Sequence, residues 1–162
     1  MRILGIDPGT ATTGYGIIEF NDDNDNISII NYGIIQTFAS EPMPSRLMSI
    51  YDDMQVLIEN FKPDIMAIEE LFFFKNAKTV ITVSQARGVL LLAANKANLI
   101  IAEYTPLEIK LTLTGYGRAD KREMQETIKD WLGLETIPKP DDAADALCIA
   151  MCHYQHIKAN VV

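Results

Sequence analysis

The chain has 162 residues, of which 48% are hydrophobic and 22% charged, a composition that is typical of a globular domain and excludes a disordered or fibrous protein. No apolar run approaches the roughly 18 residues that cross a bilayer, and Asp7 ends the first apolar run before a signal peptide could form. Two cysteines, Cys148 and Cys152, are too few for a disulfide framework. We therefore expect a cytoplasmic protein with no membrane contact.

Charge is unevenly distributed along the chain. The 14 Lys and Arg residues against 22 Asp and Glu residues give a net charge of −8 at pH 7, which on average argues against a polyanionic partner. Residues 73–122, however, hold eight basic and three acidic residues, a local charge of +5, while the rest of the chain carries −13. This basic segment is either a solvated helical face or a surface for nucleic acid, and charge alone does not decide between them.

The first half of the chain predicts a meander of strands followed by a helix and a further strand. Apolar runs rich in β-branched residues indicate strands over residues 2–7, 14–20 and 27–37, and turn-forming residues separate them. Apolar residues at three- and four-residue spacing predict an amphipathic helix over 45–61, with Ser45 as a possible cap. Residues 65–69 are long enough only for a buried strand.

The second half is mostly helical. Its patterns predict a long helix over 77–97, a strand over 99–104, and helices over 107–113, 122–132 and 141–156. No linker or repeat divides the chain, so we expect a single domain over residues 1–162. A meander followed by alternating helices and strands predicts an α/β domain with a mixed sheet that helices cover on both faces.

The predicted helix over 77–97 is apolar on two faces. At ~100° per residue, Val83 and Leu90 point one way while Ile81 and Leu92 point nearly the opposite way. One sheet can cover only one of these faces, so we expect the second to form a two-fold homodimer. The alternative is that the helices after Leu107 cover it.

Four acidic residues lie where acids are costly. Asp7 and Glu69 each end an apolar strand, and Asp142 and Asp145 lie on one face at the start of an otherwise apolar helix. A cluster of carboxylates suits the hard cations Mg²⁺ and Mn²⁺, and paired hard ions promote attack on a phosphodiester. From spacing alone, Asp7 is equally well explained as a turn residue and Asp142 as part of a helix cap.

The complete motifs favour one family. In order and spacing, the chain resembles the bacterial RuvC-type Holliday-junction resolvases from about residue 2 to residue 154, and the motifs that carry the resemblance are Ile3-Leu4-Gly5-Ile6-Asp7-Pro8-Gly9-Thr10, Gly14-Tyr15-Gly16, Ala67-Ile68-Glu69-Glu70-Leu71-Phe72, Lys75-Asn76-Ala77, Gln85-Ala86-Arg87-Gly88-Val89 and Asp142-Ala143-Ala144-Asp145-Ala146-Leu147. Each motif is weak alone, but together and in this order they are specific.

The resemblance implies an RNase H-like fold with a five-stranded mixed sheet flanked by helices on both faces. It implies a homodimeric crossover junction endodeoxyribonuclease that cuts four-way DNA junctions symmetrically in recombination and repair. Each active site would use two Mg²⁺ ions, for which Mn²⁺ may substitute. A branch-migration complex of the RuvA/RuvB type is the further partner that the family implies.

Residue by residue, the resemblance assigns the catalytic and metal-binding acids to Asp7, Glu69, Asp142 and Asp145. Asp141 and Glu70 are competing neighbours. They rank lower because the acid-Ala-Ala-acid motif starts at Asp142, and because Glu70 should point to the opposite face of its strand from Glu69.

The resemblance also implies a set of DNA contacts. Lys121 would assist at the scissile phosphate, Lys110 would grip the backbone, and the aromatic ring of Phe72 would stack on an unpaired base. The remaining predicted contacts are Lys75 and Arg87. By contrast, Cys148, Cys152, His153 and His156 fit no usual zinc spacing, so we assign them no site.

Two other functions compete with this interpretation. The turn at residues 5–10 also resembles the first phosphate loop of actin-like ATPases and sugar kinases, but those proteins need a second domain and a second glycine-rich loop, and this chain has neither. A non-catalytic junction-binding module is expected to have lost at least one of the four acids, and all four are present.

Overall fold

The computed structural model describes residues 1–21, 26–71 and 77–159. Its elements, in chain order, are β1 (Arg2–Asp7), β2 (Thr12–Phe20), β3 (Ile27–Gln36), α1 (Met43–Phe61), β4 (Ile65–Glu69), α2 (Ala77–Lys96), β5 (Ile100–Tyr104), α3 (Pro106–Thr114), α4 (Lys121–Trp131) and α5 (Asp141–Ala159). The predicted elements are all present, and their ends agree to within two residues except for the end of α5, which extends three residues further. Within the described residues, no helix combines the length and the hydropathy needed to cross a membrane.

The strands form one five-stranded mixed sheet in the order β3-β2-β1-β4-β5. β1 pairs with β2 and β2 with β3 in antiparallel fashion, while β4 runs parallel to both β1 and β5. The predicted mixed sheet is therefore confirmed. Because β1 and β4 are parallel neighbours with Ile6 paired to Ile68, the residues that follow these partners, Asp7 and Glu69, reach the same edge of the sheet.

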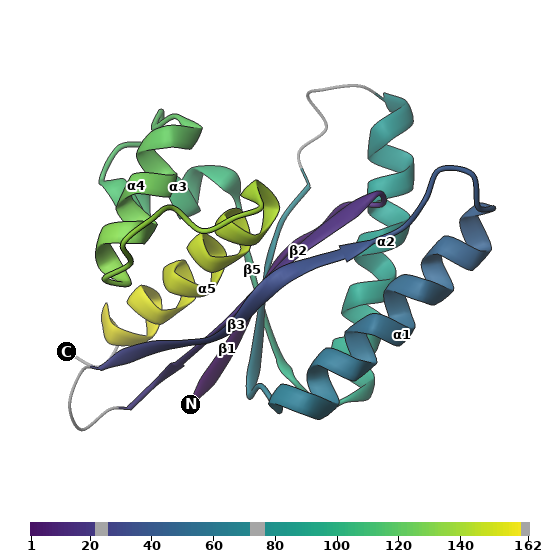
Figure 1. The fold of residues 1–162 in the computed structure, drawn as a ribbon, viewed down its shortest axis with the longest axis horizontal. Coiled ribbons are helices and arrows are strands. Elements are labelled where there is room, and N and C mark those ends of the chain that lie inside the picture. The colour runs from purple at the N-terminus through teal and green to yellow at the C-terminus, as the bar shows by residue number, and fades with distance from the viewer. Residues whose placement is uncertain (22–25, 72–76, 160–162) are drawn as a thin grey trace.

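Helices cover both faces of the sheet, as predicted (Figure 1). On one side, α1 and α2 bury a core that includes Leu4, Ile6 and Leu90. On the other side, α5 packs on the sheet with α3 and α4 outside it, around a second core that includes Ile3 and Leu147. Since α3 and α4 lie on the opposite side of the sheet from α2, the alternative in which they cover the outer face of α2 is wrong.

The helix ends explain the small differences from the predicted boundaries. Helix α1 begins at Met43, with Pro42 at the N-cap position and Pro44 in the first turn, where proline is favoured. Ser45 therefore lies inside the helix and does not cap it. Helix α4 starts at Lys121 because Asp120 and Glu123 form a reciprocal capping box, which fixes Lys121 at the first helical position.

Candidate active site

Two glycines allow α5 to lie directly against the sheet. A Cβ atom at Gly5 of β1 would lie 2.0 Å from the carbonyl oxygen of Ala146, and one at Gly14 of β2 would lie 2.0 Å from that of Asp142. Any larger residue at either position would push the helix away from the strands. This close approach brings the first turns of α5 beside the end of β1, where Asp7 lies.

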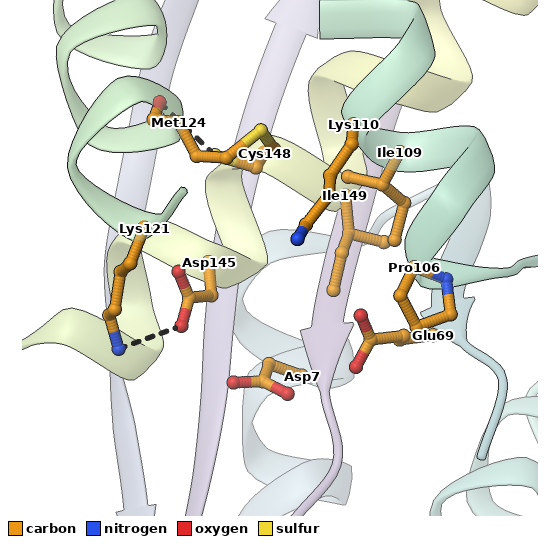
Figure 2. A pocket seen from close by; sticks show the side chains of 10 residues that line it. All are labelled: Asp7, Glu69, Pro106, Ile109, Lys110, Lys121, Met124, Asp145, Cys148 and Ile149. Atoms are coloured by element: carbon orange, nitrogen blue, oxygen red, sulfur yellow. Dashed lines mark hydrogen bonds and ion pairs between the residues drawn. The ribbon is translucent and has the colours of Figure 1, made fainter. Parts of the chain in front are cut away.

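Carboxylates from three elements line one pocket of about 220 Å³. Asp7 comes from the end of β1, Glu69 from the end of β4 and Asp145 from α5. Figure 2 shows Asp7 and Glu69 close to each other, with Asp145 above them. The other walls come from α3, α4 and α5. The residues that form them are Pro106, Ile109, Lys110, Lys121, Met124, Cys148 and Ile149.

Two lysines enter this pocket from different helices. The Lys121 ammonium lies 3.3 Å from a carboxylate oxygen of Asp145 and 3.3 Å from one of Asp141. Lys110 extends from α3 with its Nζ pointing into the space among the acids (Figure 2). The structure thus brings together both of the lysines that the sequence assigned to the scissile phosphate and the backbone.

The half-buried acids of the pocket repel one another. Burial, followed by the nearby charges of Glu69, Asp145 and Asp142, raises the pKa of Asp7 to about 8. Burial and the charge of Asp145 raise the pKa of Glu69 to about 7, although Lys110 opposes this shift. Burial is the larger cause of both shifts and repulsion among the acids adds to it, so a bound cation would favour the ionised carboxylates.

The chemistry of this donor set fits a hard divalent cation. Carboxylate oxygens are preferred by Mg²⁺ and Mn²⁺. The described residues that line the pocket include no histidine, and its thiol, Cys148, donates to the Met124 carbonyl. In the ranges that the structure describes, no three His, Cys, Asp or Glu side chains are grouped closely enough to hold an ion by themselves. Water and substrate oxygens would therefore complete the coordination, as is usual for Mg²⁺.

The fourth predicted acid, Asp142, faces a neighbouring groove that Gly9, Thr10 and Arg46 also line. It still acts on the site electrostatically, since its charge contributes to the raised pKa of Asp7. Its competitor Asp141 is exposed and pairs with Lys121.

The second competitor, Glu70, lies away from the acids of the pocket. It lines a separate hollow with Arg87 and Glu103. This placement agrees with the expectation that Glu70 and Glu69 point to opposite faces.

The predicted DNA contact Arg87 is engaged within the protein. Its side chain is 16% exposed and pairs with Glu103, and its Nε donates a hydrogen bond to the backbone carbonyl of Glu69 at 3.1 Å. This arrangement favours a role in holding the end of β4, while its contact with DNA stays a prediction. Phe72 and Lys75, the two other predicted contacts in this region, lie outside the described residues.

Sequence reasoning missed Arg46, which lies beside the loop after Asp7. It sits near the N-terminus of α1, where the helix dipole disfavours a cation. This unfavourable position was the one feature of the sequence that could have pointed to Arg46. A positive charge placed against the helix dipole suggests a role other than stabilising the helix. Arg46 lies near this loop because β2 pairs with β3. No sequence pattern links Arg46 to that pairing.

The cysteines and histidines of α5 form no site among the described residues. Cys148 and Cys152 are buried free thiols. The His153 ring nitrogen Nδ1 lies 2.6 Å from the Tyr104 hydroxyl, and His156 contacts Thr112. The contacts of both histidines are thus made within the protein.

The family model described as crossover junction endodeoxyribonuclease RuvC matches residues 3–153. The chain belongs to the RuvC family. The RuvC of Chloroflexus aurantiacus is 55% identical over 153 residues, which cover 94% of this chain and 92% of that protein. The RuvC of Fusobacterium nucleatum is 50% identical over 161 residues, covering 99% of this chain and 84% of that protein.

Solved RuvC structures show the same fold. Thermus thermophilus RuvC superimposes with a TM-score of 0.91 at 30% identity, covering 99% of this chain and 97% of that chain. The same score and identity hold for T. thermophilus RuvC in complex with a Holliday junction substrate, which the chain covers to 96%. The fold is therefore RNase H-like, as the sequence motifs implied.

Proposed function

We propose that this protein is a crossover junction endodeoxyribonuclease that resolves four-way DNA junctions by metal-dependent hydrolysis of phosphodiester bonds. The match to RuvC along nearly the whole chain carries this assignment, and the carboxylate pocket supplies the chemistry. Its substrate is DNA with four joined arms, the kind of molecule bound in the related T. thermophilus complex.

Asp7, Glu69 and Asp145, together with Asp142 at the rim, would hold two divalent ions, Mg²⁺ or Mn²⁺. When bound, such ions activate a water nucleophile and stabilise the leaving oxygen. Lys121 would donate a hydrogen bond to the phosphate and counter the charge that develops there. Its position at the start of α4, fixed by the Asp120 cap, keeps the ammonium beside Asp145.

Lys110 would hold the DNA backbone on the α3 side of the pocket, opposite Lys121. A strand that passes between these helices would meet a cation on each side and the acids below it. Phe72 and Lys75 would contact the DNA beyond the pocket, as the motifs imply.

We further propose that the 162 residues form one nuclease domain that acts as a homodimer. Ile81 and Leu92 on α2 are 63% and 59% exposed, whereas Leu90 on the same helix is fully buried against the sheet. An exposed apolar stripe of this kind fits a self-complementary contact. A dimer would provide the two symmetric active sites that paired cuts require. Cooperation with a branch-migration complex of the RuvA/RuvB type stays an expectation from the family.

The function is tested by incubating the protein with a four-way junction or a linear duplex in Mg²⁺, and separately with ATP. We expect paired cuts in opposite strands of the junction, little cutting of the duplex, and no ATP turnover. Equal cutting of both DNAs would show a nuclease without junction selectivity. ATP turnover without cutting would overturn the assignment.

A further inference from the structure

A second polar recess lies beside the N-terminus of α5, which contributes Asp142 to it. We call it the Arg46 groove. The described residues that line it are Gly9, Thr10, Ala11 and Thr12 of the β1–β2 segment, Arg46 of α1, Thr79, Thr82 and Val83 of α2, and Asp142 of α5. None of them lines the carboxylate pocket. The two recesses are nevertheless close along the chain, because Gly9 follows Asp7 of the pocket by two residues and Asp142 precedes Asp145 of the pocket by three.

Hydrogen bonds fix the position of Arg46. The buried Thr37 hydroxyl donates to the backbone carbonyl of Thr10 at 2.6 Å and accepts from Arg46 Nε at 2.9 Å. The Thr37 amide also donates to the Ala11 carbonyl at 3.0 Å. The guanidinium is thereby tied to the loop through one nitrogen, and among the residues that the structure describes it forms no ion pair. Its other nitrogens can donate to a ligand.

Thr10 supplies an independent sign of a ligand. The residue is 8% exposed, and its buried hydroxyl has no hydrogen-bond partner among the described residues. A buried hydroxyl without a partner is destabilising, so a polar group that enters the groove beside Arg46 and reaches this hydroxyl would stabilise it.

The groove is rich in groups that donate hydrogen bonds to anions. It combines the Arg46 guanidinium with the hydroxyl-bearing residues Thr10, Thr12, Thr79 and Thr82, and it contains no aromatic ring among its described lining residues. Asp142 is the one carboxylate in that set, and it is also one of the acids proposed to hold cations, which would offset its charge. Arginine and threonine side chains are typical donors to DNA phosphates, whereas recognition of a base would call for a stacking surface.

We propose that the Arg46 groove binds a backbone phosphate of the DNA close to, but distinct from, the phosphate that is cut. This site rests on the proposed function, since it places the substrate strand across the start of α5. It fixes the register of the strand in the carboxylate pocket, so Arg46 is a positioning residue that binds without touching the reacting atoms.

The test compares junctions in which single phosphates around the cut site are replaced by uncharged methylphosphonates. Affinities are measured with Ca²⁺ in place of Mg²⁺, for the wild type and for Arg46→Ala. For the wild type, we expect replacement of one phosphate other than the scissile one to weaken binding by about tenfold. Arg46→Ala should weaken binding to the unmodified junction by a similar factor and be insensitive to replacement at that position. Its salt dependence should fall by about 0.7 to 0.9 in log–log slope.

A matched control is Lys62→Asn at the far end of α1. It removes one positive charge from the same helix, and asparagine tolerates the left-handed backbone of that residue. Its affinity and salt slope should equal those of the wild type. If Arg46→Ala and Lys62→Asn weaken binding equally, or if Arg46→Ala keeps the wild-type sensitivity at every position, the proposed phosphate site is wrong.

Thr10→Val separates ligand binding from folding. Because the hydroxyl it removes has no partner among the described residues, the variant should melt at the same temperature as the wild type or slightly higher. It should nevertheless bind the junction about fivefold more weakly. A lower melting temperature with unchanged affinity would show that the hydroxyl is structural and would overturn its part in the site. Cutting of the unmodified junction in Mg²⁺ by the wild type reports on the proposed function separately.

Discussion

Arg87 Nε donates a hydrogen bond to the backbone carbonyl of Glu69 at 3.1 Å, and the same guanidinium pairs with Glu103. The arginine of α2 thus holds the end of β4, the strand that carries a buried acid of the pocket, against β5. Because it acts on the backbone, it can set the position of the Glu69 carboxylate without touching the substrate.

We therefore expect Arg87→Ala to reduce the rate of cutting at saturating enzyme by about 10- to 100-fold, since a small misplacement of a reacting group is costly. Junction affinity in Ca²⁺ should change little. Glu103→Gln is the control, because it weakens the ion pair but keeps the bond to Glu69. A loss of affinity with a normal rate at saturation would instead make Arg87 a DNA contact, as the sequence motifs implied.

Lys121 bridges Asp145 in the pocket and Asp141 outside it, each at 3.3 Å. Lys121→Ala should lower the rate of cutting by about 100-fold or more while affinity falls only slightly, because its charge acts mainly on the transition state. Asp141→Asn, which removes only the outer partner, should cut at nearly the wild-type rate. Weak binding with normal cutting at saturation would make Lys121 a positioning contact only.

The raised pKa values of the half-buried acids predict how the metal-free protein responds to pH. Burial and mutual repulsion raise the pKa of Asp7 to about 8 and that of Glu69 to about 7. The folded state therefore binds these protons more tightly than the unfolded state, whose carboxyl pKa values are about 4. The stabilisation is fully present below about pH 4 and is lost as pH rises through 7 to 8.

In EDTA, the contribution of these acids to the melting temperature should thus fall as the pH rises from 5 to 8. Asp7→Asn should flatten this fall, whereas Asp53→Asn, at an exposed position of α1, should not. Mg²⁺ or Mn²⁺ should stabilise the wild type more at pH 8 than at pH 5, because protons compete with the ions at low pH. An identical pH profile for the wild type and Asp7→Asn would contradict the burial of an uncompensated carboxylate.

The exposed stripe on α2 predicts the oligomeric state. Sedimentation of the wild type at micromolar concentration should give about twice the 18.1 kDa chain mass. Leu92→Glu should give a folded monomer, because it places a charge in the apolar contact. Leu107→Glu is the control, since Leu107 is a similarly exposed leucine on α3, in the other helix layer. A monomeric wild type at high concentration would exclude both the interface and the two-site model of cutting.

The sequence identified the acids but not how the chain arranges them. Asp7 and Glu69 could be predicted because an acid at the end of an apolar strand is conspicuous. That α5 lies close enough to add Asp145 depends on Gly5 and Gly14 facing its backbone. Such a contact between distant segments has no local pattern, so the residue spacing left Asp142 open to a simple capping role.

The same limit explains why the contacts of Arg87 and Arg46 could not be predicted from the sequence. Arg87 lies in the basic segment, and the charge pattern there suggested a contact with DNA. Only the packing of α2 against β4 and β5 reveals the hydrogen bond from Arg87 to the Glu69 carbonyl. Arg46 lies outside that segment, and its link to Thr10 passes through the buried Thr37 at the end of β3. Hydrogen bonds between distant segments depend on the order of the strands in the sheet. The sequence pattern predicted that the sheet is mixed but did not predict this order.

The most direct test of the central claim is to compare Asp7→Asn with the wild type on one four-way junction. An amide keeps the volume of the side chain but loses the charge that would hold a divalent ion. We expect Asp7→Asn to bind the junction with nearly the wild-type affinity in Ca²⁺ and to make no detectable cuts in Mg²⁺, while the wild type cuts two opposite strands. Cutting by Asp7→Asn at the wild-type rate, or a loss of binding as large as the loss of cutting, would contradict the assignment of this pocket as a metal-dependent nuclease site.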